Sequence, residues 1–154
     1  MAIAHSIVEL LQQHHVPYAV MRHAHSASSR ETAAAAHVSP ACIAKAVVLA
    51  DAHGYVLAVV PADRYVEIEK LSQVLGRELK LAPEGMLDQL FGDCEPGAVP
   101  PFGEAYHLDT IVDDALLGEP EVFFESGDHE ELVCVDGEEF ARLMGRTRHG
   151  AFSH

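Results

Sequence analysis

Two apolar segments separated by a short turn constrain the fold of this chain more than any other feature. Residues 43–50 and 55–61 are almost entirely apolar and rich in valine, and runs of that length and composition predict β-strands. The intervening residues, Asp51-Ala52-His53-Gly54, begin and end with residues that are common in turns. The sequence therefore predicts a β-hairpin in the first half of the chain.

Helix and strand signals on both sides of the hairpin indicate the fold class. Apolar residues at the start of the chain fall on one helical stripe, and Ser28 and Glu31 have the spacing of a capping box. Further helices are predicted at 67–75, 83–91 and 137–144, and further strands at 18–23, 78–81, 106–112, 121–125 and 130–135. Because strands and helices do not alternate regularly, we expect an α+β fold with a mixed, largely antiparallel central sheet flanked by helices.

The length of the chain favours one domain. Its 154 residues are enough for a single sizeable core. We expect residues 1–144 to form this domain and residues 145–154 to be a flexible C-terminal tail. No apolar run approaches the roughly 20 residues that span a bilayer, and the first residues lack the pattern of a signal peptide. We therefore expect a cytoplasmic protein without membrane contacts.

The charge of the chain argues against tight, stand-alone binding to a long nucleic acid. Its net charge is −14, and residues 81–141 contain 17 acidic residues and no lysine or arginine. A protein that holds a phosphate backbone by itself normally shows a basic patch. We therefore expect no DNA partner and, for RNA, recognition of the tip only.

Lys45 is the polar residue that the apolar pattern explains least. It interrupts residues 42–49, which are otherwise apolar, and an ammonium group without a partner is costly to bury. Strand alternation places it on the same face as Ile43 and Val47. Two interpretations stay open: a functional cation, or an edge lysine that reaches solvent and blocks strand pairing.

A loop rich in glycine and proline is the second candidate feature. Residues 95–103 carry two glycines and three prolines. Small side chains let a ligand approach the backbone, whose N–H groups can donate to a carbonyl or an oxyanion. Composition alone favours a rigid structural turn. The turns that carry His25 and His129 offer imidazole groups, again with a plain polar turn as the alternative.

Metal and triad chemistry lack their usual sequence signatures. The three cysteines, Cys42, Cys94 and Cys134, are far apart and form no CxxC pair, and neither HExxH nor GxSxG occurs. We expect no metal site, no cofactor and no nucleophilic thiol.

Four segments, taken together and in order, resemble the YbaK/EbsC family, which includes the editing domain associated with prolyl-tRNA synthetase. These segments are residues 43–49, 57–63, 96–103 and 126–129. The resemblance covers nearly the whole chain, from about His25 to Met144. It implies hydrolysis of misacylated tRNA.

The resemblance also implies roles for individual residues. Lys45 would be the main polar group of the pocket, engaging the phosphate or ribose of the terminal adenosine. The segment from Gly97 to Pro101 would shape the pocket beside the scissile ester, and His129 would help to form the amino-acid pocket. The implied catalytic residues are thus Lys45, Gly97 and Pro101. The implied substrate-binding residues are His25, Ser28, Ala98, Val99, Pro100, Phe102, Gly103, Gly127, Asp128 and His129.

The implied reaction is attack of water on the ester that joins an amino acid to the 3′ end of tRNA, assisted by the substrate's own ribose hydroxyl. An aminoacyl ester is already activated, so positioning and carbonyl polarisation can carry much of the rate. The expected substrate is tRNA-Pro with a small non-cognate amino acid, bound by its acceptor end, with prolyl-tRNA synthetase or an elongation factor as delivery partner. Three alternatives stay open: a non-catalytic module that binds aminoacyl-tRNA or a nucleotide, a hydrolase of small aminoacyl esters, and a structural protein with a rigid loop.

Overall fold

The β-hairpin is the longest paired element of the structure, a computed structural model that describes residues 4–24, 26, 28–94, 98–125, 127–128 and 130–154. Strands β2 (Ala44–Asp51) and β3 (Gly54–Pro61) pair antiparallel along their whole length. The Asp51 carboxylate accepts hydrogen bonds from the N–H groups of His53 at 2.8 Å and Gly54 at 3.1 Å, which closes the turn. The predicted hairpin is confirmed.

The hairpin lies within a five-stranded mixed sheet with the order β4-β2-β3-β5-β8. Strand β4 (Lys80–Leu81) pairs antiparallel with β2, whereas β5 (Asp109–Asp113) runs parallel to β3 and β8 (Arg148–Gly150) runs parallel to β5. A second sheet has three antiparallel strands in the order β1-β7-β6. Its strands are β1 (Ala19–Arg22), β6 (Glu121–Glu125) and β7 (Glu131–Asp136).

A parallel bridge between Ile43 and Phe123 connects the two sheets. The predicted fold class, α+β with largely antiparallel pairing, is confirmed, and the strands are divided between two sheets. The helices are α1 (His5–Gln13), α2 (Ser29–Ala36), α3 (Ile68–Leu75), α4 (Glu84–Leu90), α5 (Asp114–Leu117) and α6 (Gly137–Leu143), with 3-10 turns η1 (Pro40–Cys42) and η2 (Gly103–Tyr106). No helix among the described residues is long and apolar enough to cross a membrane.

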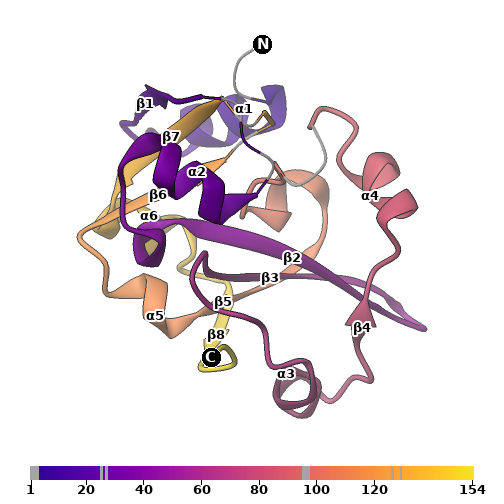
Figure 1. Ribbon diagram of the computed structural model, residues 1–154. Helices are drawn as coiled ribbons and strands as arrows, with labels where there is room; N and C mark the ends of the chain where they lie inside the picture. Colours follow the sequence, from indigo (N-terminus) through magenta and orange to yellow (C-terminus); the bar gives the residue numbers. More distant parts are fainter. Residues whose placement is uncertain (1–3, 25, 27, 95–97, 126, 129) are drawn as a thin grey trace.

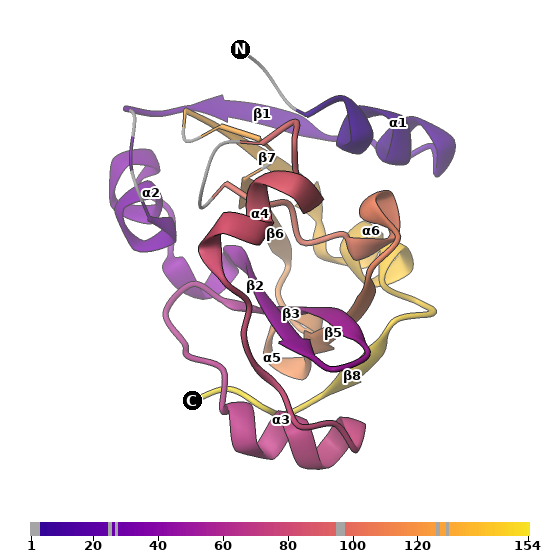
Figure 2. The same ribbon diagram turned by 90° about the vertical axis from the view of Figure 1, so that its right-hand side faces the viewer.

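Both faces of the hairpin are covered, which explains why its strands are almost continuously apolar. On one face, Leu57 and Val59 join a core with α1, α6 and the three-stranded sheet. On the other face, Val56, Ala58 and Val60 pack with side chains of α3 and the C-terminal segment. Figures 1 and 2 show the three-stranded sheet with α1 and α2 on one side of the hairpin and α3 on the other.

The expectation of a flexible tail over residues 145–154 was wrong. Part of this segment forms β8, and Phe152 is fully buried in the core cluster beneath α3. Backbone hydrogen bonds of 2.8 and 2.9 Å join Tyr65 and His154, and the Asp113 carboxylate accepts from Phe152 N (3.1 Å) and Ser153 Oγ (2.8 Å). The sequence signal was weak because one buried phenylalanine and a three-residue strand produce no periodicity.

Candidate functional site

Lys45 lies near the start of β2, where its ammonium group is half-buried and has a protein partner. Nζ donates a hydrogen bond of 2.7 Å to the backbone carbonyl of Arg64 and lies 5.2 Å from the centre of the Tyr65 ring. The side chain shares the face of the strand that Ile43 and Val47 occupy. Lys45 is therefore held in place and does not extend freely into solvent.

A second cation lies on the same aromatic ring. The guanidinium of Arg30, on α2, is 5.4 Å from the centre of the Tyr65 ring and donates to the carbonyl of Asp63 at 3.4 Å. Burial lowers the pKa of Lys45 below its ordinary value, the Arg30 charge lowers it further, and Asp63 acts in the opposite direction. A half-buried and an exposed positive charge on the same aromatic ring favour the binding of an anion.

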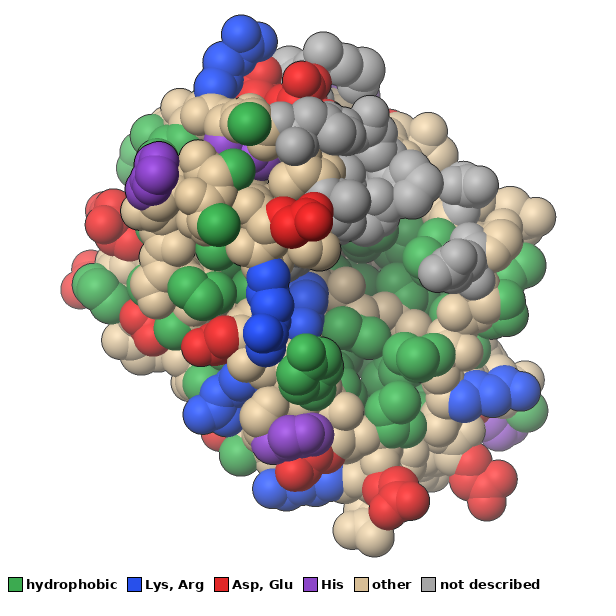
Figure 3. Space-filling model, in the orientation of Figure 1, with side chains coloured by type: hydrophobic (Ala, Val, Ile, Leu, Met, Phe, Trp, Pro, Cys, Tyr) green, Lys and Arg blue, Asp and Glu red, His purple; other side chains and the backbone are tan. Residues whose placement is uncertain are grey.

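The fold places these residues together through the chain that leaves β3. After Pro61 the backbone turns back over the start of β2, and Ala62 N donates to the Ile43 carbonyl at 2.9 Å. Residues 63–65 then pass beside Lys45, which is opposite Val60 in the hairpin register. In Figure 3, basic side chains gather over the start of β2 beside a hollow lined by hydrophobic side chains.

A buried polar network lies between α2 and the end of β6. Thr32 Oγ1 donates to Glu125 Oε1 at 2.6 Å, so its second contact, with Ser26 Oγ at 2.5 Å, must be one in which Ser26 donates. All three side chains are buried. The network ties the segment before α2 to β6 and so fixes the start of α2, from which Arg30 projects. Ser28 caps the same helix by accepting a 3.2 Å hydrogen bond from Glu31 N, as the predicted capping box requires.

The glycine–proline loop and the turn around Gly127 meet in space. Gly127 N donates a hydrogen bond of 3.0 Å to the Ala98 carbonyl. Ala98 is fully buried and Val99 is half-buried. The contact brings together two of the four sequence segments on which the resemblance rests. His25, Gly97 and His129, which the sequence also singles out, lie outside the described residues.

The end of the loop packs into the core. The Phe102 ring meets Phe124 edge to face at 4.9 Å and Phe140 at 6.0 Å between ring centres. A methyl group at Gly103 would collide with the Thr110 hydroxyl and lie 2.7 Å from the Leu108 carbonyl oxygen. Pro100 and Pro101 are buried as well. These contacts show that the end of the loop packs against the protein core. The predicted role of these residues in substrate binding stays a prediction.

The two carboxylate oxygens of Asp128 have different surroundings among the described residues. Oδ1 accepts hydrogen bonds from the N–H groups of Glu130 (3.1 Å) and Glu131 (3.0 Å) and so closes the turn. Oδ2 is buried and has no hydrogen-bond partner within the described part of the chain. A buried acceptor without a partner is costly, so this oxygen is a candidate contact for a cationic group of a ligand.

The cysteines lack the features of nucleophiles. Burial raises the pKa of Cys42 and Cys134 to about 11 and that of Cys94 to about 12, and neighbouring carboxylates contribute in each case. All three thiols are therefore protonated near neutral pH. Among the described residues, no three His, Cys, Asp or Glu side chains are grouped so that they could hold a metal ion.

Sequence reasoning missed most of the surroundings of Lys45. Arg30 and Tyr65 belong to a helix and a loop whose residues look like ordinary surface positions. Glu125, which binds Thr32 of the same helix as Arg30, offered a weak signal, because it is an acidic residue at the end of the apolar strand segment Glu121–Glu125. These residues become neighbours only through the crossing of β2, α2 and the segment after β3.

Comparisons with known proteins identify the family and the fold of the chain. The sequence profile of the aminoacyl-tRNA editing domain matches residues 23–143, whereas no curated protein matches the chain. Among solved structures, a hypothetical protein, APE2540, is similar over 97% of this chain and 99% of its own, with a TM-score of 0.85 and 22% identity. A candidate trans-editing enzyme for prolyl-tRNA synthetase is similar over 98% of this chain and 96% of its own, with a TM-score of 0.82 and 24% identity. At these identities the similarity shows a shared fold.

Proposed function

Because the chain belongs to the aminoacyl-tRNA editing domain family, we propose that it hydrolyses the ester of misacylated tRNA and thereby removes a wrongly attached amino acid. The observation that carries this proposal is the position of Lys45. Its ammonium group is anchored by the Arg64 carbonyl and shares the Tyr65 ring with the Arg30 guanidinium. A half-buried ammonium group beside an exposed guanidinium group suits the phosphate and ribose of a terminal nucleotide.

The other segments supply the rest of the proposed site. The backbone of the loop that begins at Ala98 is proposed to lie along the scissile ester and polarise its carbonyl group. Asp128 Oδ2, which is buried and has no partner among the described residues, is proposed to accept a hydrogen bond from the substrate's α-ammonium group. The substrate ribose hydroxyl is proposed to assist the attacking water.

The proposed substrate is tRNA-Pro that carries a small amino acid other than proline. The similarity to a candidate trans-editing enzyme for prolyl-tRNA synthetase supports this choice. Excluding or admitting one methylene group is worth only about 1–3 kcal/mol, so a synthetase cannot reject near-isosteres by binding alone. A separate hydrolase that acts on the released aminoacyl-tRNA would add a second selection against the wrong amino acid.

The decisive experiment is release of the amino acid from a panel of misacylated tRNAs. We expect hydrolysis of alanyl-, cysteinyl-, seryl- or threonyl-tRNA-Pro and not of prolyl-tRNA-Pro. Lys45→Ala should lower kcat/KM by about a hundredfold or more, because it removes a positioning charge. Lys70 lies on α3 and pairs with Glu67, the residue before this helix. Lys70→Ala is the matched control and should leave the rate unchanged.

The alternatives give different results in the same assay. A binding module would hold the aminoacyl-tRNA without releasing the amino acid. A hydrolase of small esters would act equally well on an aminoacyl ester of adenosine. Full activity of a folded Lys45→Ala variant would refute the proposed role of Lys45.

A further inference from the structure

A second polar site lies beyond α3, away from Lys45. A groove of about 990 Å³ runs between the end of α3, η2, β5 and the segment from α6 to β8, and it is lined by Arg77, Arg142, Arg146 and Arg148. The chain contains seven arginines in all and has a net charge of −14. Four of the seven arginines therefore lie in one groove of an acidic protein.

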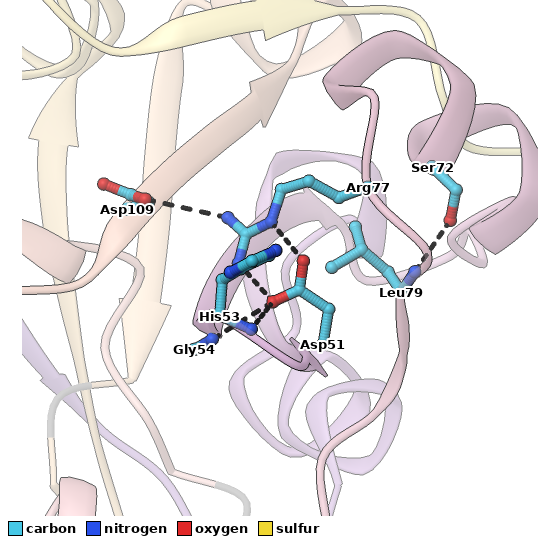
Figure 4. Close-up of polar contacts among 7 residues, drawn as sticks. All are labelled: Asp51, His53, Gly54, Ser72, Arg77, Leu79 and Asp109. Atoms are coloured by element: carbon cyan, nitrogen blue, oxygen red, sulfur yellow. Dashed lines mark hydrogen bonds and ion pairs between the residues drawn. The ribbon is translucent and has the colours of Figure 1, made fainter.

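Two of these arginines are held by the protein itself. Arg77 binds the Asp51 carboxylate through two hydrogen bonds of 2.7 and 2.8 Å, and its Nη1 lies 3.7 Å from Asp109, as Figure 4 shows. Arg142 contacts Glu139 at 2.6 Å and donates to the His14 carbonyl at 2.9 Å. These side chains build the groove and have limited capacity for a further ligand.

Arg146 and Arg148 are different. Both are exposed, and neither side chain has a hydrogen bond or ion pair with another part of the described chain. The acidic residues of the lining are Asp109, which faces Arg77, and Glu104, which lies 4.0 Å from His14. Arg77 and Arg142 are neutralised by their carboxylate partners, so Arg146 and Arg148 are the guanidinium groups of the described lining that are ready to bind an anion.

One arginine of the groove, Arg148, is aligned with the face of the five-stranded sheet that carries Lys45. The registers align Arg148 with Ile111, Ile111 with Ala58, and Ala58 with Val47, and aligned residues share a face. Lys45 is two residues from Val47 along β2. With a strand spacing of about 4.8 Å and a rise of about 3.3 Å per residue, the Cα atoms of Arg148 and Lys45 are roughly 16 Å apart.

We propose that this groove binds the phosphate backbone of the RNA substrate beyond its 3′-terminal nucleotides, with Arg146 and Arg148 as the main contacts. This inference rests on the proposed function, since a strand that is held by its end at Lys45 carries further phosphates at such distances. A guanidinium group binds a phosphate through two parallel hydrogen bonds. A local cluster of this kind lets an acidic protein hold RNA in one orientation while the rest of its surface repels it.

The test compares a long and a short substrate. In the double variant Arg146→Ala/Arg148→Ala, we expect KM for misacylated tRNA to rise roughly tenfold while kcat stays unchanged, because the two contacts act on binding alone. The slope of log affinity for uncharged tRNA against log salt concentration should decrease by about 1–2, since up to two phosphate contacts are lost. Hydrolysis of an aminoacylated CCA trinucleotide, which lacks all phosphates beyond the three terminal nucleotides, should match the wild type.

Controls separate the groove from the catalytic site. Lys70→Ala removes an exposed positive charge outside the groove and should leave both substrates and the salt slope unaffected. An unchanged KM and salt slope in the double variant would overturn the inference while leaving the proposed function intact. Equal losses on tRNA and trinucleotide would also overturn it, because they would indicate a general structural effect. If the wild type hydrolyses no substrate, the proposed function fails, and binding of uncharged tRNA still decides the role of the groove.

Discussion

Gly127 occupies a backbone conformation that restricts the residue type at this position. Its φ is +125°, a region that residues with a side chain rarely adopt. An added Cβ would also lie 3.1 Å from Ala4 N and 3.3 Å from the Asp93 carbonyl oxygen. Since Gly127 N donates to the Ala98 carbonyl, this one residue joins the turn that carries Asp128 to the glycine–proline loop.

Gly127→Ala should therefore lower the free energy of unfolding by about 1–3 kcal/mol, because alanine is strained at this φ. Urea unfolding followed by circular dichroism measures the change. Gly118→Ala is the control: Gly118 has a φ of −99°, and an added Cβ there meets nothing within 4 Å. The control should change stability by less than about 0.5 kcal/mol, and equal effects of the two substitutions would contradict the argument.

At the scale of elements, the C-terminal segment contacts the loop whose carbonyl group binds Lys45. Its backbone pairs with Tyr65 and Glu67, and Arg64 Nη1 donates to the Ser153 carbonyl at 3.4 Å. The Arg64 carbonyl in turn accepts the hydrogen bond from Lys45. Phe152 anchors the whole segment in the core cluster that includes Leu71 of α3. The last residues of the chain thus help to set the position of the Lys45 ammonium group.

Phe152→Ala tests this arrangement. Removal of a fully buried phenylalanine should cost about 3–5 kcal/mol of unfolding free energy, measured by thermal or urea unfolding. Val74→Ala, at a position on α3 that is 45% exposed, should cost less than about 1 kcal/mol, because little burial is lost. A small effect of Phe152→Ala, similar to that of the control, would mean that the segment is frayed in solution.

At the scale of the whole molecule, positive charges gather in two places. The acidic residues between 81 and 141 contrast with two groups of positive charge, one around Lys45 and one in the arginine groove. Because acidic surfaces repel RNA, the proposed RNA contacts should be confined to these two groups. The proposed binding of RNA should therefore be oriented and sensitive to salt.

Titratable groups in several elements also define how the stability of the molecule depends on pH. The hydrogen bonds from Arg77 hold the pKa of Asp51 well below its ordinary range. Burial would raise the pKa of Asp93, but hydrogen bonds from Ser6, Tyr106 and Cys94 outweigh it and hold that pKa below its ordinary value. Burial raises the pKa of Tyr106, and it raises that of Cys94 to about 12.

Stability should therefore be highest between about pH 5 and pH 8. The carboxylates with lowered pKa stabilise the fold above about pH 4, where they are ionised even when unfolded, and this contribution is lost as the pH falls. The groups with raised pKa stabilise it below about pH 9, and this contribution is lost as the pH rises toward 12. Urea midpoints across pH 2–11 measure the profile.

A carboxylate variant isolates the acidic limb of this profile. Asp93→Asn should make the loss of stability below about pH 4 shallower, whereas Glu138→Gln, at an exposed position on α6, should leave its shape unchanged. Identical acidic limbs in the wild type and the Asp93→Asn variant would contradict the role assigned to Asp93.

Much of the local structure could be predicted because its signals are local. The hairpin, the cap at Ser28 and the end of α3 at Gly76 follow from apolar runs, a capping spacing and a glycine that adopts a φ of 66°. The strand expected from residue 106 begins instead at Asp109, because residues Gly103–Tyr106 form a 3-10 turn. The short helix Asp114–Leu117 was not predicted, since four residues carry no helical period.

The sequence by itself determined that Lys45 is an unusual cation in an apolar strand, that the loop before residue 103 is stiff, and that the chain resembles an editing domain. Only the tertiary structure decided that Lys45 shares an aromatic ring with Arg30, that Ala98 meets Gly127, and that four arginines form one groove. The physical reason is that these contacts join residues far apart in the chain. Periodicity and capping act over a few residues, whereas the packing of sheets and helices around a shared core sets which distant side chains become neighbours.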